Sequence, residues 1–179
     1  NWAVRAGKKV SSSRLQRQPL GAVDLAQFVA AQKLIFDPLQ EKLGGRLRFA
    51  VSGGAPLSRE IAEFFHSANI LLLEGYGLTE TTAAVTVNTP LEYCFGTVGK
   101  PFGDVQIRLA EDGEVLVHSQ KVMPEYYQDA EATRSAFTED GFFKTGDIGE
   151  FTDDGFLRIT DRKKDLIKTA GGKYVAPQR

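Results

Sequence analysis

Apolar residues recur at helical spacing along the first part of the chain, most clearly over residues 21–43. Asp37-Pro38 interrupts this spacing, and proline is favoured at the first position of a helix. We therefore predict a new helix that begins at Pro38, with Asp37 as its N-cap and Gln40 completing a capping box. Gly44-Gly45 is expected to end the helical segment.

Two apolar runs further along have the length and spacing of strands. Residues 47–51 alternate between polar and apolar side chains, whereas residues 70–73 are continuously apolar, as in a strand covered on both faces. Between them, Ser58 should cap a helix whose apolar stripe is expected to be buried. The stripe consists of Ile61, Phe64, Phe65 and Ala68. A strand–helix–strand order of this kind predicts a parallel pair of strands.

The pattern changes after residue 95, where short alternating stretches are separated by turns. Three Asp-Gly pairs mark the turns, at 112–113, 140–141 and 154–155. We expect strands over residues 105–109, 114–118 and 156–160 and one short helix over residues 129–135. The predicted fold class is therefore α/β, with a partial parallel-sheet part followed by a β-rich, barrel-like part.

Composition and charge narrow the possible functions. The chain has 179 residues, of which 42% are hydrophobic and 25% charged, and its formal net charge is −1. Its apolar runs are far shorter than the roughly 20 residues of a transmembrane helix, and no secretory signal is recognisable. One cysteine, Cys94, and two widely separated histidines argue against disulfides and against Cys- or His-rich metal sites. The near-neutral charge gives no basis for nucleic-acid binding.

The first 20 residues contain five basic side chains and no acidic one. Charge runs of this kind usually form a solvated surface, and an anion-binding patch is the alternative. We expect residues 1–20 to be a solvated segment.

Two stretches that follow predicted strands carry residues suited to a nucleotide. Ser52-Gly53-Gly54-Ala55-Pro56 lies where ligands of open α/β sheets bind, although a plain tight turn would also explain it. In the second stretch, Tyr76 stands between two glycines and offers an aromatic face, while Thr79 offers a hydroxyl. Glu80 supplies a hard oxygen ligand of the kind that suits Mg²⁺. A capped helix N-terminus would explain Thr79 and Glu80, but not the glycines.

Two later stretches add a carboxylate and a group of cations. Asp147, which ends Lys144-Thr145-Gly146-Asp147, is suited to chelating vicinal ribose hydroxyls, and a surface turn is the alternative. Residues 160–177 contain Arg162, which suits bidentate contact with oxygens, and several lysines that could neutralise phosphates. A solvated charged turn is the alternative for this stretch. Neither a P-loop nor a Ser-x-Gly elbow with a histidine-centred triad is recognisable.

The order of these four motifs resembles that of the adenylate-forming superfamily, which includes acyl-CoA synthetases, aryl-CoA ligases, luciferases and peptide-synthetase adenylation domains. The motifs are SGGAP at 52–56, GYGLTET at 75–81, KTGD at 144–147 and DRKKDLIK at 161–168. The double-glycine loop over residues 168–177 is most similar to that of the long-chain fatty acid CoA ligases. Leu78 stands where peptide-synthetase domains usually have proline. The resemblance covers residues 44–178.

This resemblance implies a reaction in two steps. A carboxylate attacks the α-phosphate of Mg-ATP to give an acyl-adenylate and pyrophosphate, and the thiol of CoA then displaces AMP to give a thioester. By the same resemblance, one group of residues would bind ATP, with the adenine between the first loop and the tyrosine and the ribose on the aspartate. These residues are Gly54, Ala55, Pro56, Gly75, Tyr76, Gly77, Thr79, Asp147 and Arg162.

Further roles follow from the resemblance alone. Thr79 and Glu80 would be the catalytic residues, with Thr79 on a phosphate oxygen and Glu80 on Mg²⁺. Asp161 and Lys164 would belong to a hinge about which a C-terminal lid rotates between the two steps. Gly171 and Gly172 would line the path of CoA.

The resemblance also implies that the chain is an internal piece of a longer enzyme. The family's phosphate-binding loop and its lid lysine are not found in the sequence, so we expect the chain to be catalytically inert alone. Residues 1–95 would belong to an N-terminal α/β subdomain, residues 96–160 to a β-barrel-like subdomain, and residues 161–179 to the hinge and the start of the lid. Uncovered edges and apolar faces would favour self-association.

Several alternatives remain open from the sequence. The preferred interpretation is part of a long-chain fatty acid CoA ligase with fatty acid, ATP and CoA as small-molecule partners. A CoA ligase for aryl or shorter acids is one alternative, and a non-catalytic nucleotide-binding module is another. Because ATP and CoA are available in the cytoplasm, we expect a cytoplasmic protein, and peripheral contact with the inner face of the membrane stays open.

Overall fold

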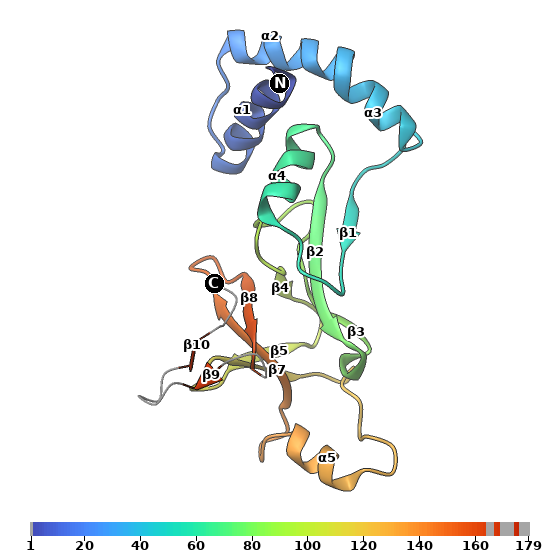
Figure 1. The fold of residues 1–179 in the computed structure, drawn as a ribbon, viewed down its shortest axis with the longest axis vertical. Helices are drawn as coiled ribbons and strands as arrows, with labels where there is room; N and C mark the ends of the chain where they lie inside the picture. The colour runs from blue at the N-terminus through green and yellow to red at the C-terminus, as the bar shows by residue number, and fades with distance from the viewer. Residues whose placement is uncertain (1, 164–166, 169–173, 176–179) are drawn as a thin grey trace. The chain divides into compact units, whose positions relative to one another are not determined.

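The computed structural model describes residues 2–163, 167–168 and 174–175, which form two compact units. The first unit comprises Asn1–Glu74 and Thr89–Gly96, and the second comprises Gly75–Asn88 and Thr97–Arg179. Strand β2 (Leu72–Leu78) runs from the first unit into the second (Figure 1). Its first residues therefore belong to one hydrophobic core and its last residues to another.

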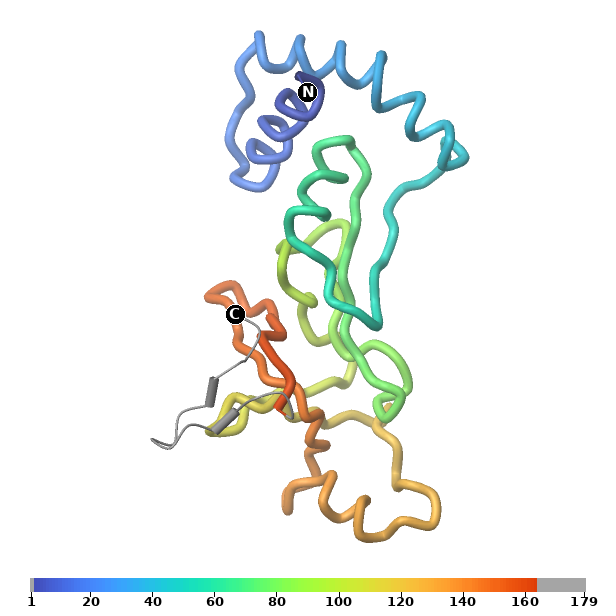
Figure 2. The backbone as a smooth tube through the Cα atoms, viewed as in Figure 1, coloured from blue at the N-terminus to red at the C-terminus, as the bar shows by residue number. Residues whose placement is uncertain are grey.

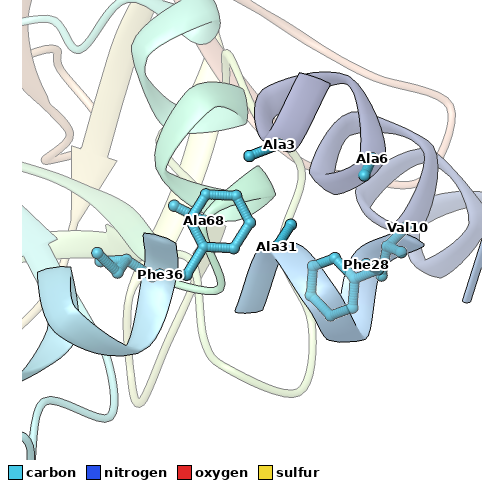
Figure 3. Close-up of a cluster of buried hydrophobic side chains, with 8 residues drawn as sticks. Ala3, Ala6, Val10, Phe28, Ala31, Phe36 and Ala68 are labelled. Carbon is cyan, nitrogen blue, oxygen red and sulfur yellow. The ribbon is translucent and has the colours of Figure 1, made fainter. Parts of the chain in front are cut away.

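Helices make up most of the first unit, and small side chains let them pack closely. The helical elements are α1 (Trp2–Gln16), α2 (Ala22–Ala31), the π-helical turn η1 (Gln32–Phe36), α3 (Asp37–Lys42) and α4 (Arg59–Ser67). A cluster of buried residues joins them (Figure 3), namely Ala3, Ala6, Val10, Phe28, Ala31, Phe36, Ala68 and Ile70. A Cβ on Gly7 would lie 2.0 Å from the carbonyl oxygen of Ser67, so glycine permits the close approach of α1 to α4.

The prediction of a solvated segment over residues 1–20 is wrong for most of its length. Residues 2–16 form helix α1, and Ala3, Ala6 and Val10 are buried along one side of it. The basic side chains of this segment lie on the exposed side of the helix or beyond it. The charge run is therefore the polar face of an amphipathic helix, and the spacing of its small apolar residues was the overlooked signal.

The predicted helix start at Pro38 with Asp37 as its N-cap is wrong, because α3 follows directly on η1 and Asp37 is already helical. Figure 2 shows the continuous helical path of residues 22–42, and Asp37 has helical dihedral angles (φ −62°, ψ −47°). Its side chain is not an N-cap, but accepts a 2.6 Å hydrogen bond from Nε2 of Gln32. Pro38 lacks an N–H and would clash with the carbonyl four residues earlier, and the π-helical turn at Gln32–Phe36 accommodates it.

The predicted parallel pair is confirmed, with shifted bounds. β1 (Ala50–Ser52) pairs in parallel with β2 in the register Ala50↔Leu72, Val51↔Leu73 and Ser52↔Glu74. Residues 47–49 are not part of the strand, and residues 70–71 precede β2, which instead continues to Leu78. The pairing with β2 begins only at Ala50, so the alternating pattern over residues 47–49 does not extend the strand.

Helix α4 buries only part of the predicted stripe, because Ala68 is buried and Phe65 packs against the core of the first unit, whereas the other two residues are exposed. Ile61 and Phe64 are 48% and 43% exposed, whereas Ala62, His66 and Ser67 are buried. Ser58 occupies the N-cap position, but its side chain makes no capping hydrogen bond. Small residues make the contact with α1, so Ile61 and Phe64 remain uncovered by the described residues.

His66 is the polar centre of the α1–α4 contact. Its Nδ1 lies 2.6 Å from Oγ of Ser11 and its Nε2 lies 3.1 Å from the hydroxyl of Tyr93. Burial, with a smaller contribution from the positive charge of Arg14, lowers the pKa of His66 to about 4. The neutral imidazole, with one donor and one acceptor nitrogen, is therefore the form that this core accommodates.

We expect acid to destabilise the first unit through His66. Because the folded pKa lies below the unfolded value, protons bind the unfolded chain preferentially, and stability falls from about pH 6.5 to about pH 4. The loss should approach 3 kcal/mol at most, on the order expected for a shift of this size. Urea unfolding followed by the fluorescence of the single tryptophan, Trp2, measures it. A His66→Gln variant should lack this part of the pH dependence; an identical profile in both proteins contradicts the assignment.

Antiparallel strands make up most of the second unit. The end of β2 pairs with β3 (Ala83–Val87), which pairs with β4 (Lys100–Pro101). A four-stranded sheet has the order β5 (Gln106–Leu109), β6 (Glu114–His118), β7 (Phe143–Phe151) and β8 (Leu157–Arg162). The remaining elements are a turn, η2 (Thr79–Thr81), the helix α5 (Ala130–Ala136), and a pair of strands, β9 (Ile167–Lys168) and β10 (Tyr174–Val175).

The predicted elements of this half are confirmed within one or two residues. Asp129 caps α5 by accepting a 2.9 Å hydrogen bond from the backbone nitrogen of Ala132. The glycines of the three Asp-Gly pairs all have positive φ, from 79° to 86°. Val85, Val105, Val115, Val117 and Leu157 form the core. The fold class is thus α/β, with a parallel strand pair followed by a β-rich part.

Within the described part of the chain, the helices are too short or too polar to cross a membrane.

Candidate functional site

Three side chains from separate sequence motifs meet in the second unit. Tyr76 lies on β2, Asp147 on β7 and Arg162 at the end of β8. The hydroxyl of Tyr76 donates a 2.6 Å hydrogen bond to Oδ2 of Asp147. Nε of Arg162 lies 3.4 Å from Oδ1 of the same carboxylate, because Asp147 and Arg162 are register partners of the β7–β8 pair. Sequence analysis singled out all three residues. One sheet brings Asp147 and Arg162 together, and Tyr76 reaches Asp147 from β2 of another sheet.

The hydroxyl of Tyr76 stays a hydrogen-bond donor, and Asp147 accepts from it. Burial, reinforced by the hydrogen bond to Asp147, raises the pKa of Tyr76 far above its ordinary value, so its hydroxyl stays protonated and donates. Asp147 is only 5% exposed, and each of its oxygens has one partner among the described residues. A carboxylate oxygen has capacity for a second donor, so Asp147 can still accept two hydroxyl protons. Arg162 is 70% exposed, and its ion pair with Asp147 is correspondingly weak.

The irregular stretch of β7 that carries Asp147 is held by a hydroxyl and a carboxylate. The backbone nitrogen of Asp147 donates to Oγ1 of Thr145 over 3.1 Å, and that hydroxyl donates to the carbonyl of Val115 over 2.7 Å. The backbone nitrogen of Gly146 donates to Oε1 of Glu114 over 3.0 Å. Sequence reasoning missed Glu114. An acidic residue in an apolar strand such as residues 114–118 is the signal that could have found it.

The glycines beside Tyr76 have a structural role in a strand. The GYG sequence lies inside β2, and not beyond a strand as we predicted. A Cβ on Gly77 would lie 2.0 Å from the carbonyl oxygen of Ala83, and one on Gly75 would lie 3.2 Å from that of Thr86. The register of β2 and β3 also shifts between Tyr76 and Gly77. The glycines therefore permit a close strand pair, while Tyr76 is half-buried beside the core.

Thr79 and Glu80 are the first two residues of η2, a single turn of 3-10 helix whose N-cap is Leu78. Thr79 is exposed and Glu80 is half-buried, with Oε1 accepting a 3.1 Å hydrogen bond from the hydroxyl of Tyr126. Thr81 is fully buried, and its Oγ1 accepts a 2.9 Å hydrogen bond from the backbone nitrogen of Leu78. Thr81 and Tyr126 were missed by sequence analysis. They fix the turn and the direction of Glu80.

Glu80 offers a single carboxylate for a cation. The structure, over the residues it describes, contains no group of three or more His, Cys, Asp or Glu side chains arranged to hold a metal ion. Its Oε2 has no protein partner among those residues. Mg²⁺ is commonly held by one or two carboxylates together with substrate phosphates and water. Glu80 therefore fits a cation that arrives with a phosphate ligand, and not an all-protein cage.

Gly54, Ala55 and Pro56 belong to the first unit, in the exposed loop that follows β1. Gly54 has φ +80°, and a Cβ placed on it would meet nothing within 4 Å, so the backbone of this loop is open to a flat ligand. Beside the loop, the buried Glu74 accepts a 3.1 Å hydrogen bond from the backbone nitrogen of Leu57, and burial raises the pKa of its carboxyl. Glu74 was also missed as a site residue.

The remaining predicted residues lie at the C-terminal end of the chain. Asp161 is on β8, and its Oδ1 accepts a 2.9 Å hydrogen bond from the backbone nitrogen of Arg162. Lys164, Gly171 and Gly172 lie outside the described residues. Their proposed roles in a hinge and in a path for CoA stay predictions.

Comparisons with known proteins agree on one family. The sequence profile of the AMP-binding enzyme family matches residues 18–127. The chain is 47% identical over 177 residues to the long-chain-fatty-acid–CoA ligase FadD15 of Mycobacterium bovis, covering 98% of this chain and 29% of that protein. It is 40% identical over 161 residues to long-chain-fatty-acid–CoA ligase 1 of Saccharomyces cerevisiae, covering 84% and 23%.

A solved structure shares the fold. The O-succinylbenzoate coenzyme A synthetase of Bacillus subtilis, in complex with AMP, superposes with a TM-score of 0.64 at 28% identity. The match covers 78% of this chain and 32% of that one. The chain thus spans less than a third of the length of these relatives.

Proposed function

Since this chain belongs to the AMP-binding enzyme family, we propose that it forms the central part of an ATP-dependent long-chain fatty acid CoA ligase. In this proposal the chain is one part of a longer polypeptide, the full-length ligase. That ligase converts a fatty acid to an acyl-adenylate and then to an acyl-CoA. The observation that carries the proposal is the Tyr76–Asp147–Arg162 cluster. Its buried carboxylate retains acceptor capacity for the two hydroxyls of a ribose.

The proposed roles follow from the position of each residue. Asp147 accepts from the ribose hydroxyls, and Tyr76 and Arg162 hold it in place. The open loop at Gly54, Ala55 and Pro56 is the proposed contact for one face of the adenine, and the ring of Tyr76 is proposed to stack on the base. Gly75 and Gly77 serve this site indirectly, because they set the strand that carries the tyrosine.

The phosphates and the cation are assigned to the turn after β2. Thr79 presents an exposed hydroxyl to a phosphate oxygen, and Glu80 provides one carboxylate for Mg²⁺, directed by Tyr126. When bound with ATP, Mg²⁺ stabilises the negative charge that develops on the phosphate oxygens. The chain's own contribution is to position the carboxylate and the hydroxyl next to each other.

The acyl substrate is assigned from the relatives. Those with the higher identities are named long-chain-fatty-acid–CoA ligases, whereas structural neighbours include enzymes for aromatic acids. Fatty acid, ATP and CoA are therefore the proposed substrates, and an aryl or shorter acid is the alternative that the test must separate. These substrates favour a cytoplasmic location, with peripheral membrane contact as an extension of the proposal.

The proposed organisation places residues 1–95 in an α/β subdomain, residues 96–160 in a β-barrel-like subdomain and residues 161–179 in the hinge and lid. Within residues 161–179, Asp161 and Lys164 are assigned to the hinge, and Gly171 and Gly172 to the path of CoA. Apolar side chains that the described residues leave exposed, including Ile61 and Phe64, would be covered in the full-length ligase. In the isolated chain they are a surface for self-association.

Exchange of radiolabelled pyrophosphate into ATP tests the proposal. We expect the full-length ligase to catalyse exchange only with a long-chain fatty acid, and the 179-residue chain to catalyse none with any acid. Exchange that depends on an aryl acid supports the alternative substrate class. Binding of AMP without exchange under any condition supports a non-catalytic nucleotide module and overturns the ligase assignment.

A further inference from the structure

Glu114 occupies an unusual position for a carboxylate. It is the first residue of β6 and is only 5% exposed. Its Oε1 accepts a 3.0 Å hydrogen bond from the backbone nitrogen of Gly146, the residue before Asp147. Its Oε2 lies 2.6 Å from Nζ of Lys163, the residue after β8. One buried side chain thus joins the stretch of β7 that presents Asp147 to the end of the strand that carries Arg162.

These contacts close a ring around the proposed ribose site. Asp147 pairs with Arg162, Arg162 is bonded to Lys163 along the chain, and Lys163 pairs with Glu114. Glu114 then returns to Asp147 through the amide of Gly146. Asp112 adds a second carboxylate 2.7 Å from Lys163, outside the ring. The two carboxylates raise the pKa of Lys163, so its ammonium is charged at neutral pH.

A buried carboxylate is stable only while it is paired and hydrogen-bonded. If the ammonium of Lys163 is drawn away, Glu114 loses its counter-charge and keeps only the Gly146 amide. The stretch of β7 that presents Asp147 then loses part of its support. The position of the chain after β8 and the geometry of Asp147 are therefore expected to depend on each other.

We propose that Glu114 is a positioning residue that couples the ribose-binding carboxylate Asp147 to Lys163 and the hinge segment that begins at Asp161. This inference rests on the proposed function, which assigns ribose binding to Asp147 and a hinge to residues 161–164. Glu114 itself touches no substrate in this arrangement. It acts through the backbone of Gly146 on one side and through an ammonium on the other.

Four variants of the full-length ligase test the proposal by their KM for ATP in pyrophosphate exchange. Glu114→Ala removes both contacts and should raise the KM for ATP about tenfold, with the KM for the acid unchanged. Glu114→Gln keeps an oxygen that accepts from Gly146 and should restore the KM to within about threefold of the original. Lys163→Met should raise the KM for ATP about threefold in the original protein. Combined with Glu114→Ala, it should cause no further rise, because the two residues act through one ring.

Asp140→Asn is the matched control. It also converts an acid of the second unit to its amide, but its partner is Arg108 on the exposed surface, 2.8 Å away. The KM for ATP of this variant should stay within about twofold of the original. Protection of the Gly146 amide from hydrogen exchange provides a second measurement, and it should fall in Glu114→Ala but not in Glu114→Gln.

The outcomes separate this proposal from the proposed function. An unchanged KM for ATP in Glu114→Ala, together with an impaired Asp147→Ala, overturns the role of Glu114 and leaves the nucleotide site standing. If Asp147→Ala is also unimpaired, the nucleotide site is wrong and both proposals fall. If Glu114→Ala does not fold, the Glu114→Gln and Lys163→Met variants decide, and additive effects of the two contradict a shared ring.

Discussion

Asp147→Ala is expected to weaken binding of AMP to the full-length ligase by about 100-fold, since it removes a charged acceptor for two ribose hydroxyls. The alanine also leaves the half-buried hydroxyl of Tyr76 without its 2.6 Å partner, which adds a cost in stability. Asp147→Asn separates the two effects, because its amide oxygen still accepts from Tyr76. This variant should fold normally and weaken AMP about 30-fold, as one of its two acceptors becomes a donor. Titration calorimetry measures both.

A ligand without the hydroxyls provides the control. AMP that lacks both the 2′ and the 3′ hydroxyl should bind the original protein about as weakly as AMP binds the asparagine variant. Asp147→Asn should weaken this dideoxy ligand by less than about threefold, because the interaction is already absent. Equal losses for AMP and for the dideoxy ligand would mean that Asp147 acts through the fold and does not contact the ribose.

The cluster of Tyr76, Asp147 and Arg162 could be anticipated from the sequence because the order of four motifs carries information that no single motif does. Each motif alone has an ordinary structural explanation, and part of that explanation is correct, since Gly75 and Gly77 are required by the strand pair. The contact between Tyr76 and Asp147 depends on how strands of two separate sheets pack, which local patterns do not specify across 71 positions.

Predictions from local sequence patterns were wrong where tertiary packing determines which residues are buried and where a helix begins. Ile61 and Phe64 have the spacing of a buried stripe, but α4 packs on α1 through small residues and leaves them exposed. Asp37-Pro38 has the sequence of a helix start, yet a π-helical turn absorbs the proline without a break. The pattern shows which faces are apolar, and tertiary contacts determine which of them are covered.

Glu114 and Thr81 were missed for a related reason. Both are polar residues in positions that local patterns treat as exposed or as turn residues, and both are buried because their oxygens satisfy backbone groups. Lys163 was recognised only as one cation in a charged stretch, whereas the structure pairs it with two carboxylates. Only the three-dimensional structure identifies the two carboxylate partners of Lys163, because they lie 49 or more positions before it along the chain.

Gly77→Ala is expected to destabilise the second unit by more than about 4 kcal/mol, because the new methyl group would overlap a backbone oxygen. The oxygen is that of Ala83, 2.0 Å from the position of the added carbon. It cannot move away easily. Thr82 and Ala83 have φ of 51° and 88°, and the buried Thr81 hydroxyl lies 2.9 Å from this same carbonyl. Relief of the overlap therefore requires β3 to separate from β2 or the turn η2 to open.

Gly75→Ala is the matched comparison on the other side of Tyr76. Its added carbon would lie 3.2 Å from the carbonyl oxygen of Thr86, an overlap that a shift of a few tenths of an ångström relieves. We expect a cost of about 1 kcal/mol for this variant, measured by urea unfolding followed by circular dichroism. Similar costs for the two alanines would show that β2 and β3 are not closely paired at Gly77. If only Gly77→Ala lowers the free energy of unfolding strongly, Gly77 is required for the close pairing of β2, the strand that carries Tyr76, with β3. Nucleotide binding should then fall together with stability.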